Sequence, residues 1–167
     1  MLIIVDMQNE YVDMNGKAPI KGAKKLENGI LDRIKYYENR GERIYYTINT
    51  KVSDRNRDKS DLDWAIRPYG KLDQALVKHN KIEKTNYGIS LEKGLEIKNS
   101  IKDDNDIKRI EFLGVETNIC VLANGIIFQN LFPDAKILVN SKLCASSNEM
   151  LHIKAFDIMK EFEMEVI

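Results

Sequence analysis

Five short stretches of the chain are rich in apolar and β-branched residues, and we predict that each forms a strand. They are LIIV at 2–5, RIYYTI at 43–48, IKRIEFLGV at 107–115, AKILV at 135–139 and EMEVI at 163–167. A shorter sixth candidate surrounds KIEK at 81–84. Several of these stretches are continuously apolar instead of alternating, which is typical of strands that are buried on both faces of a sheet.

Segments with a helical repeat of apolar residues lie between the predicted strands. In residues 22–40 the apolar side chains fall on one stripe, and Gly41 follows as a stop signal. Further helices are expected at 71–79, at 91–102, at 118–131 with Pro133 just past its end, and from a capping box of Ser146 and Glu149 to about Lys160. Because strands alternate with helices, we predict one α/β domain over residues 1–167, a three-layer α/β/α sandwich with a mainly parallel, Rossmann-like sheet.

One long segment, residues 50–70, shows no regular pattern. Loops longer than about 12–15 residues inside a compact domain are often functional. Two interpretations stay open. The segment is either a solvated surface loop anchored by Trp64 or a lid over an active site.

The charge balance, the lengths of the apolar runs and the cysteine count indicate which kinds of partner and which cellular compartment to expect. The 167 residues carry 26 Lys and Arg against 26 Asp and Glu, so there is no basic excess for binding nucleic acid. The longest apolar runs are far shorter than a membrane span of roughly 20 residues, and the first residues lack the features of a secretory signal. Two cysteines do not make a disulfide framework. We therefore expect a cytoplasmic protein with reduced thiols that binds neither nucleic acid nor a membrane.

Three reactive side chains follow predicted strands. Asp6 ends the first strand, Lys84 ends KIEK, and Cys120 lies in the turn after the strand that contains IEFLGV. In an open parallel sheet, ligands bind outside the carboxyl ends of the strands, and side chains at neighbouring strand ends can converge there. Taken singly, each has an ordinary interpretation as a turn aspartate, a solvated lysine or a small buried thiol. Together they predict a cysteine nucleophile with acid–base partners.

The chemistry of such a triple is coherent. A free thiol with a pKa near 8.5 is only a few per cent thiolate at about neutral pH. An ammonium group about 4 Å away stabilises the thiolate by on the order of 4 kcal/mol before desolvation, whereas a helix N-terminus contributes about 0.3–2 kcal/mol. We therefore expect Lys84 to lower the pKa of the Cys120 thiol. Asp6 is expected to take the thiol proton and to return it to a leaving amine.

Four segments, in order along nearly the whole chain, resemble the isochorismatase-like cysteine hydrolases, the family that includes the nicotinamidases. IIVDMQNEYV resembles the strand-Asp-x-Gln signature, with Tyr11 where Phe is usual, and EKTNYG resembles the lysine segment. LGVETNICV resembles the nucleophile segment Gly-Val-x-Thr-x-x-Cys, and SKLCASSNEMLHIKAF resembles the segment before the last helix. The resemblance implies a catalytic triad of Asp6, Lys84 and Cys120. It also implies an oligomeric protein, so we expect a homo-oligomer.

The same resemblance implies a particular backbone around the nucleophile. A cis peptide is expected between Val115 and Glu116. The oxyanion hole would then use the backbone N–H groups of Glu116 and Cys120.

The sequence departs from the nicotinamidases at their metal site. Those enzymes carry an Asp-x-His pair after the second strand and a further His downstream, which together hold a metal beside the triad. Here Asn49 and Lys51 occupy the first two positions, and Tyr69 aligns with the third. We therefore predict no catalytic metal and no cofactor.

These residues favour a cysteine amidohydrolase that cleaves the C–N bond of a small amide through a thioester. Tyr11, Trp64, Tyr69 and Tyr87 could bind the substrate as walls of its pocket, with simple packing as the alternative for each. Two other functions stay open: a nicotinamidase that works without the usual metal, and a non-catalytic binding or oligomerisation module of the same fold. Cys144 lies outside the nucleophile motif, and we interpret it as a core residue.

Overall fold

The computed structural model describes residues 1–51, 57–101 and 107–167, and a six-stranded sheet runs through its centre. All pairs of neighbouring strands are parallel, and their order is β3-β2-β1-β4-β5-β6. The strands are β1 (Leu2–Val5), β2 (Ile44–Asn49), β3 (Asn80–Lys84), β4 (Arg109–Val115), β5 (Lys136–Ala145) and β6 (Glu165–Val166). This is the doubly wound order of Rossmann-type sheets, so the predicted fold class is confirmed.

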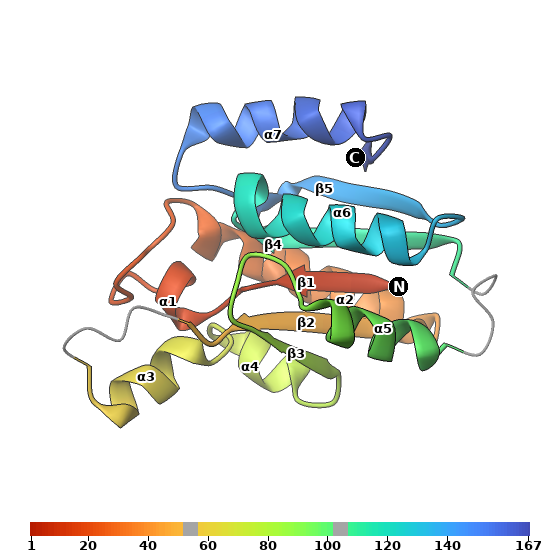
Figure 1. The fold of residues 1–167 in the computed structure, drawn as a ribbon. Coiled ribbons are helices and arrows are strands. Elements are labelled where there is room, and N and C mark those ends of the chain that lie inside the picture. The colour runs from red at the N-terminus through yellow and green to blue at the C-terminus, as the bar shows by residue number, and fades with distance from the viewer. Residues whose placement is uncertain (52–56, 102–106) are drawn as a thin grey trace.

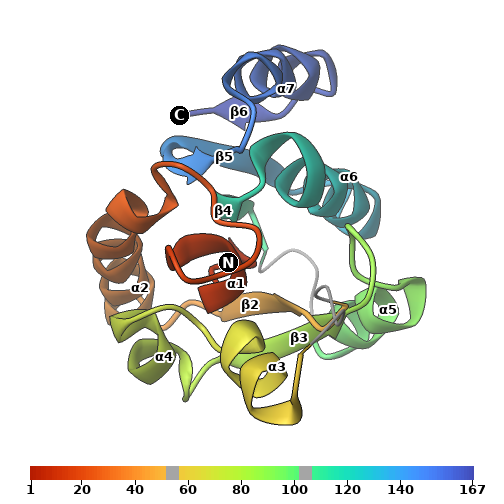
Figure 2. The same cartoon turned by 90° about the vertical axis from the view of Figure 1, so that its left-hand side faces the viewer.

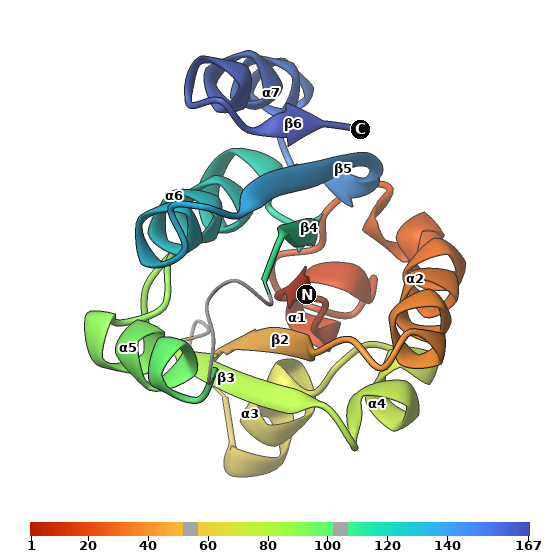
Figure 3. The ribbon, with the colours of Figure 1, turned by 90° about the vertical axis from the view of Figure 1, so that its right-hand side faces the viewer.

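Helices cover both faces of the sheet (Figures 1 and 2). One face carries η1 (Ala23–Leu26), α2 (Glu27–Asn39) and α4 (Lys71–Leu76), and the other carries α5 (Leu91–Asn99), α6 (Leu122–Leu131) and α7 (Glu149–Glu161). Two short helices, α1 (Asn9–Val12) and α3 (Lys59–Ile66), lie at the carboxyl ends of the strands (Figure 1). The view from the opposite end shows the same two layers on either side of the sheet (Figure 3). Within the described ranges, no helix is long and apolar enough to cross a membrane.

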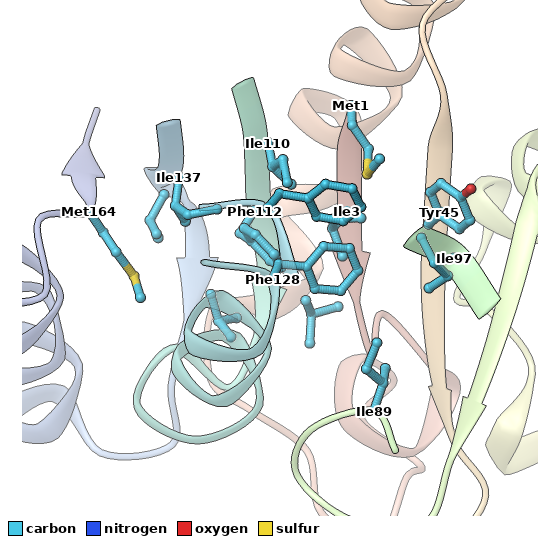
Figure 4. Packing of buried hydrophobic residues seen from close by; sticks show 14 of the residues in the cluster. Met1, Ile3, Tyr45, Ile89, Ile97, Ile110, Phe112, Phe128, Ile137 and Met164 are labelled. Carbon is cyan, nitrogen blue, oxygen red and sulfur yellow. The ribbon is translucent and has the colours of Figure 1, made fainter. Parts of the chain in front are cut away.

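A separate apolar cluster fills the space between each helical layer and the sheet. On the α5–α6 side, Phe112 of β4 meets Phe128 of α6 edge to face, with ring centroids 5.4 Å apart (Figure 4). Phe128 also stacks on Phe132. Cys144 is 5% exposed in this cluster, as expected for a core residue. The two clusters make the sheet a rigid platform for the side chains at its carboxyl edge.

Several segments differ from the sequence-based predictions, including α1, which was not predicted, and the ends of α4 and α5, which come earlier than expected. Residues 50–70 are not one irregular loop, because α3 forms in them with Asp58 as its N-cap, accepting a hydrogen bond from the backbone N–H of Asp61; residues 52–56 lie outside the described ranges. Strand β5 runs beyond 135–139, because a shift of register between Phe112 and Gly114 of β4 allows pairing to continue to Ala145. Strand β6 is shorter than 163–167.

The predicted capping box of α7 is wrong. The N-cap is Asn148, whose side chain accepts the backbone N–H of Leu151 at 3.0 Å. Ser146 is instead turned toward the segment that follows β4, where its hydroxyl contacts Glu116 at 3.1 Å and Asn118 at 2.5 Å. Ser146 therefore does not cap α7, because its hydroxyl binds side chains of the segment after β4.

Candidate active site

Three side chains from separate strands meet at the carboxyl edge of the sheet. Asp6 follows β1, Lys84 ends β3, and Cys120 lies in the π-helical turn η3 (Thr117–Val121) that leads from β4 into α6. The Lys84 ammonium nitrogen lies 2.7 Å from Asp6 Oδ2 and donates to Cys120 Sγ at 3.6 Å. Strands β1 and β4 flank the point where the winding of the sheet reverses, which is where open α/β sheets bind ligands. The convergence expected from the sequence is present.

Asp6 is held in an unusual backbone conformation by a neighbour on β2. Its φ of 49° lies in the left-handed region, which Asp tolerates better than most residues. The Asp6 backbone N–H donates to the Thr47 hydroxyl at 3.1 Å, and that hydroxyl donates to Asp6 Oδ1 at 2.6 Å. Among the described residues, no donor meets Oδ2 with good hydrogen-bond geometry, although it pairs with Lys84. Thr47 therefore fixes one carboxylate oxygen and leaves the other facing the site.

Close packing of backbone against backbone shapes the segment that leads to Cys120. Gly114 has a φ of 117°, and a Cβ atom there would lie 2.2 Å from the carbonyl oxygen of Val5. Only glycine fits that approach. One residue further on, the peptide bond between Val115 and Glu116 is cis, as expected.

Residues from the end of β5 to the first turn of α7 form hydrogen bonds with Glu116 and Thr117, which lie between β4 and Cys120. The Glu116 carboxylate accepts the backbone N–H of Ser147 at 2.8 Å and its hydroxyl at 2.7 Å. The Thr117 hydroxyl donates to the Ala145 carbonyl at 3.0 Å and lies 2.8 Å from His152 Nδ1. Burial lowers the pKa of His152, which favours a neutral ring at this contact.

A buried amide, Asn124, joins the turn of Cys120 to the loop that follows β3. It is completely buried on α6, and its Nδ2 donates to the Cys120 carbonyl at 2.7 Å. Sequence reasoning missed both Asn124 and Thr47. The signal for Asn124 was a polar residue one helical turn after the cysteine, in the mainly apolar first part of the helix.

The electrostatics of the three side chains differ from the expectation. Burial, followed by the charge of Asp6, raises the pKa of the Cys120 thiol to about 12, and Lys84 offsets only part of this. Burial also raises the pKa of Asp6, against the lowering influence of Lys84. Lys84 does lower the pKa of the Cys120 thiol, as predicted, but burial and Asp6 together outweigh it, and the sequence did not predict this net rise. Burial and the Asp6 carboxylate therefore favour the protonated thiol, against the influence of Lys84.

The Tyr11 hydroxyl binds Asn49, one of the three residues compared above with the metal ligands of the nicotinamidases. Burial, followed by the negative charge of Asp6, raises the pKa of Tyr11, so its hydroxyl lies within the electrostatic reach of Asp6. Asn49 Nδ2 donates to that hydroxyl at 3.0 Å, and Asn49 Oδ1 accepts the backbone N–H of Lys51 at 3.0 Å. Asn49 is thus already engaged. No group of three or more His, Cys, Asp or Glu residues in the described part of the chain is arranged to hold a metal ion, so the residues present do not fit one.

The other aromatic candidates lie in different surroundings. Tyr69 is buried in the apolar cluster on the α2 side, beneath Lys24. Trp64 is half-buried on α3, with its carbonyl accepting from Asn9 Nδ2 at 2.9 Å. Tyr87 is 65% exposed. Of the four, Tyr11 is the one whose pKa responds to the charge of Asp6, and the substrate-binding roles of all four stay predictions.

A cavity of about 520 Å³ borders the lysine side of the site. Its walls come mostly from the end of β3 and the loop that follows, with α6 opposite, and include Thr50, Lys84, Asn86, Ile89 and Ile127. The volume falls within the roughly 300–1,000 Å³ range of small-molecule sites. The three reactive side chains themselves are almost closed to solvent, with Cys120 at 8% the most exposed.

The isochorismatase domain family matches the chain over residues 1–167. The chain belongs to the isochorismatase family. No curated protein sequence matches it. The family assignment therefore rests on the match along the full chain, and it agrees with the motifs quoted above.

Solved structures of this family share the fold. A nicotinamidase from Staphylococcus aureus is 24% identical, with 99% of this chain and 96% of that chain covered at a TM-score of 0.77. A nicotinamidase/pyrazinamidase from Bacillus subtilis is 21% identical, covering 99% and 97%, at a TM-score of 0.80. A pyrazinamidase from Pyrococcus horikoshii, solved in complex with zinc, is 15% identical, covering 99% and 97%, at a TM-score of 0.75. At these identities the likeness establishes the isochorismatase-family hydrolase fold.

Proposed function

We propose that this isochorismatase-family protein is a cysteine-dependent amidohydrolase that cleaves the C–N bond of a small amide through a thioester. The single observation that carries the proposal is the buried Lys84 ammonium, 2.7 Å from Asp6 Oδ2 and 3.6 Å from Cys120 Sγ. A nucleophile, a base and a cation in mutual reach are what acyl transfer from an amide requires.

Asp6 supplies the proton transfers in this proposal. Its Oδ2 takes the thiol proton as Cys120 Sγ forms a bond to the amide carbonyl carbon. The tetrahedral intermediate collapses, Asp6 gives that proton to the departing nitrogen, and ammonia or an amine leaves behind a thioester. Water then attacks the thioester while Asp6 takes its proton, the C–S bond breaks, and Asp6 returns the proton to the Cys120 sulfur as the carboxylic acid leaves. The backbone N–H groups of Glu116 and Cys120 hold the oxyanion in both steps.

The raised pKa values support this order of events. A thiol with a pKa of about 12 carries little thiolate at neutral pH, so nucleophilic attack must be coupled to removal of its proton. Burial raises the pKa of Asp6 toward the operating pH, which improves the carboxylate as a base. Lys84 balances the charge that moves between oxygen and sulfur. Its role is thus to hold the site's total charge near zero.

The fold likeness to nicotinamidases makes nicotinamide the first specific substrate to test. In this chain Asn49 donates to Tyr11 at 3.0 Å in the region where those enzymes bind a metal. We propose that any amide turned over here is bound without a metal, with the Tyr11 ring as one wall of its pocket.

An ammonia-release assay over a panel of small aliphatic and aromatic amides, including nicotinamide and pyrazinamide, tests the proposal. Wild type is compared with Cys120→Ala, and Cys144→Ala is the matched control because it removes the other buried thiol. We expect Cys120→Ala to lose activity, Cys144→Ala to keep it, and a chelator to change neither. No turnover of any amide by wild type would favour a non-catalytic binding module.

A further inference from the structure

We propose that Asn124 is a positioning residue that sets the distance between the Lys84 ammonium and the Cys120 sulfur. This inference rests on the hydrolase function proposed above and names a further residue of the same site. Asn124 touches neither the thiol nor the carboxylate in any described contact. It acts through the backbone on both sides of the reacting groups.

The Asn124 side chain uses both ends of its amide. Its Oδ1 accepts the backbone N–H of Ile89 at 3.0 Å. Its Nδ2 donates to the Tyr87 carbonyl at 3.2 Å and to the Cys120 carbonyl at 2.7 Å. With no exposed surface, it has no water to replace these partners.

The three bonds join two segments that are distant in sequence. Tyr87 and Ile89 belong to the loop between β3 and α5, and Cys120 belongs to η3. The same loop holds the lysine, because the Lys84 ammonium donates to the Asn86 carbonyl at 2.9 Å. A path of short hydrogen bonds thus runs from the lysine through the loop and Asn124 to the backbone of the nucleophile.

The loop between β3 and α5 packs against α6, and its buried backbone polar groups form hydrogen bonds with Asn124. Gly88 faces α6 so closely that a Cβ atom there would lie 2.4 Å from Ile127 Cδ1. On either side of Gly88, the Tyr87 carbonyl and the Ile89 N–H point to Asn124. An apolar side chain at 124 would leave these groups buried and unpaired, so the loop must move to reach other partners. Lys84 would move with it.

A double-mutant cycle on the alkylation rate of Cys120 tests the positioning role of Asn124 without requiring a substrate. The second-order rate of Cys120 with iodoacetamide is measured at fixed pH in four proteins: wild type, Lys84→Met, Asn124→Leu and the double variant. In wild type the ammonium supports the thiolate, so Lys84→Met should slow alkylation by about tenfold or more. If Asn124 holds Lys84 in place, Lys84→Met should slow the Asn124→Leu protein by less than about threefold. Any change in access to the thiol cancels within each pair.

Asn130 offers a matched control on the same helix. Its Nδ2 donates to the Ile126 carbonyl at 2.8 Å, one turn back, as Asn124 does to Cys120, but Asn130 is exposed. In an Asn130→Leu background, Lys84→Met should keep its full effect. Asn124→Thr should retain most of the coupling, because a hydroxyl can still bond to the Cys120 carbonyl and accept the Ile89 N–H.

Two further readouts separate positioning from general loss of fold. In Asn124→Leu, hydrogen exchange at the Ile89 amide should become faster, while circular dichroism and exchange in β1 and β4 stay as in wild type. If the protein hydrolyses an amide, kcat should fall about 10- to 100-fold with KM nearly unchanged.

Equal slowing by Lys84→Met in all backgrounds would overturn the role of Asn124, whether or not an amide is hydrolysed. Absence of turnover in wild type, with the coupling intact, would instead reject the hydrolase function and leave the positioning role standing. The two failures are therefore distinguishable.

Discussion

The ammonium of Lys84 and the carboxylate of Asp6 form an ion pair with an N–O distance of 2.7 Å and almost no exposed surface on either side chain. A pair of opposite charges out of water is costly to assemble, and breaking it by removing one partner is costlier still. Lys84 is also 3.6 Å from Cys120 Sγ, so the pair cannot be replaced by apolar side chains without losing the proposed chemistry. Stability and function oppose each other at this site.

We predict that Lys84→Met destabilises the fold by about 3 kcal/mol near neutral pH, because the Asp6 carboxylate is left buried without a cation. The double variant Asp6→Leu/Lys84→Met should recover most of that loss while remaining inactive. Urea unfolding measures both. The exposed pair Lys81–Glu83, also 2.7 Å apart, is the control, and Lys81→Met should cost less than about 1 kcal/mol. A double variant as unstable as Lys84→Met would contradict this account.

Removing the charge of Asp6 should lower the pKa of the Cys120 thiol and speed its alkylation. A cysteine that is already a thiolate would not show this increase in rate. The negative charge of Asp6 raises the thiol pKa, so Asp6→Asn should lower it. Iodoacetamide should therefore alkylate Cys120 slowly in wild type at pH about 8 and faster in Asp6→Asn, even though that variant is inactive as a hydrolase. Mass spectrometry of the labelled peptide gives the rates. A slower reaction in Asp6→Asn would mean that the carboxylate assists, and does not oppose, the thiolate.

As the pH is lowered, kcat/KM should begin to fall at a higher pH than it would with a carboxylate base of ordinary pKa. Asp6 must be ionised to accept the thiol proton, and burial raises its pKa. As the pH falls through this raised value, Asp6 becomes protonated and kcat/KM should decline, above the roughly 3.9 of an unperturbed Asp. Thr47→Val removes a hydrogen bond that lowers the Asp6 pKa, so it should move the acid limb to still higher pH. An acid limb that does not move in Thr47→Val would count against Asp6 as the base.

The close approach of β1 and β4 should tolerate no side chain at Gly114. In Gly114→Ala, the new methyl group would lie 2.2 Å from the Val5 carbonyl oxygen and 2.8 Å from the Val5 nitrogen, and backbone atoms cannot step aside. Because Val5 precedes Asp6, both the fold and activity should suffer. Gly41→Ala is the matched control, since Gly41 also has a positive φ, of 65°, but a Cβ atom there would meet no atom of the described residues within 4 Å. Thermal unfolding should show a much larger loss for Gly114→Ala than for Gly41→Ala.

The site could be predicted from the sequence because its three reactive residues lie at or just after the ends of predicted strands. Asp6, Lys84 and Cys120 each follow a recognisable strand, and the parallel sheet brings such positions together. Thr47 and Asn124 escaped prediction because their roles depend on which strand or loop lies opposite them. Thr47 matters because β2 pairs with β1 so that it faces Val5.

Burial and long-range contacts explain the pKa of Cys120 and the N-cap of α7, which the sequence did not predict. The upward shift of the Cys120 pKa depends first on burial and then on the balance of two neighbouring charges, and neither can be read from spacing along the chain. The N-cap of α7 moved from Ser146 to Asn148 because Ser146 contacts Glu116, 30 residues earlier. Short-range signals identified the elements, and long-range contacts decided these details.

The most direct test of the central claim is to trap the acyl group on sulfur. Wild type mixed with an amide that it hydrolyses is quenched in acid within the first turnover, and the digested protein is analysed by mass spectrometry. We predict an adduct with the mass of the substrate's acyl group on the peptide that contains Cys120, retained in Cys144→Ala and lost in Cys120→Ala together with ammonia release. Ammonia release at the wild-type rate by Cys120→Ala would contradict the account.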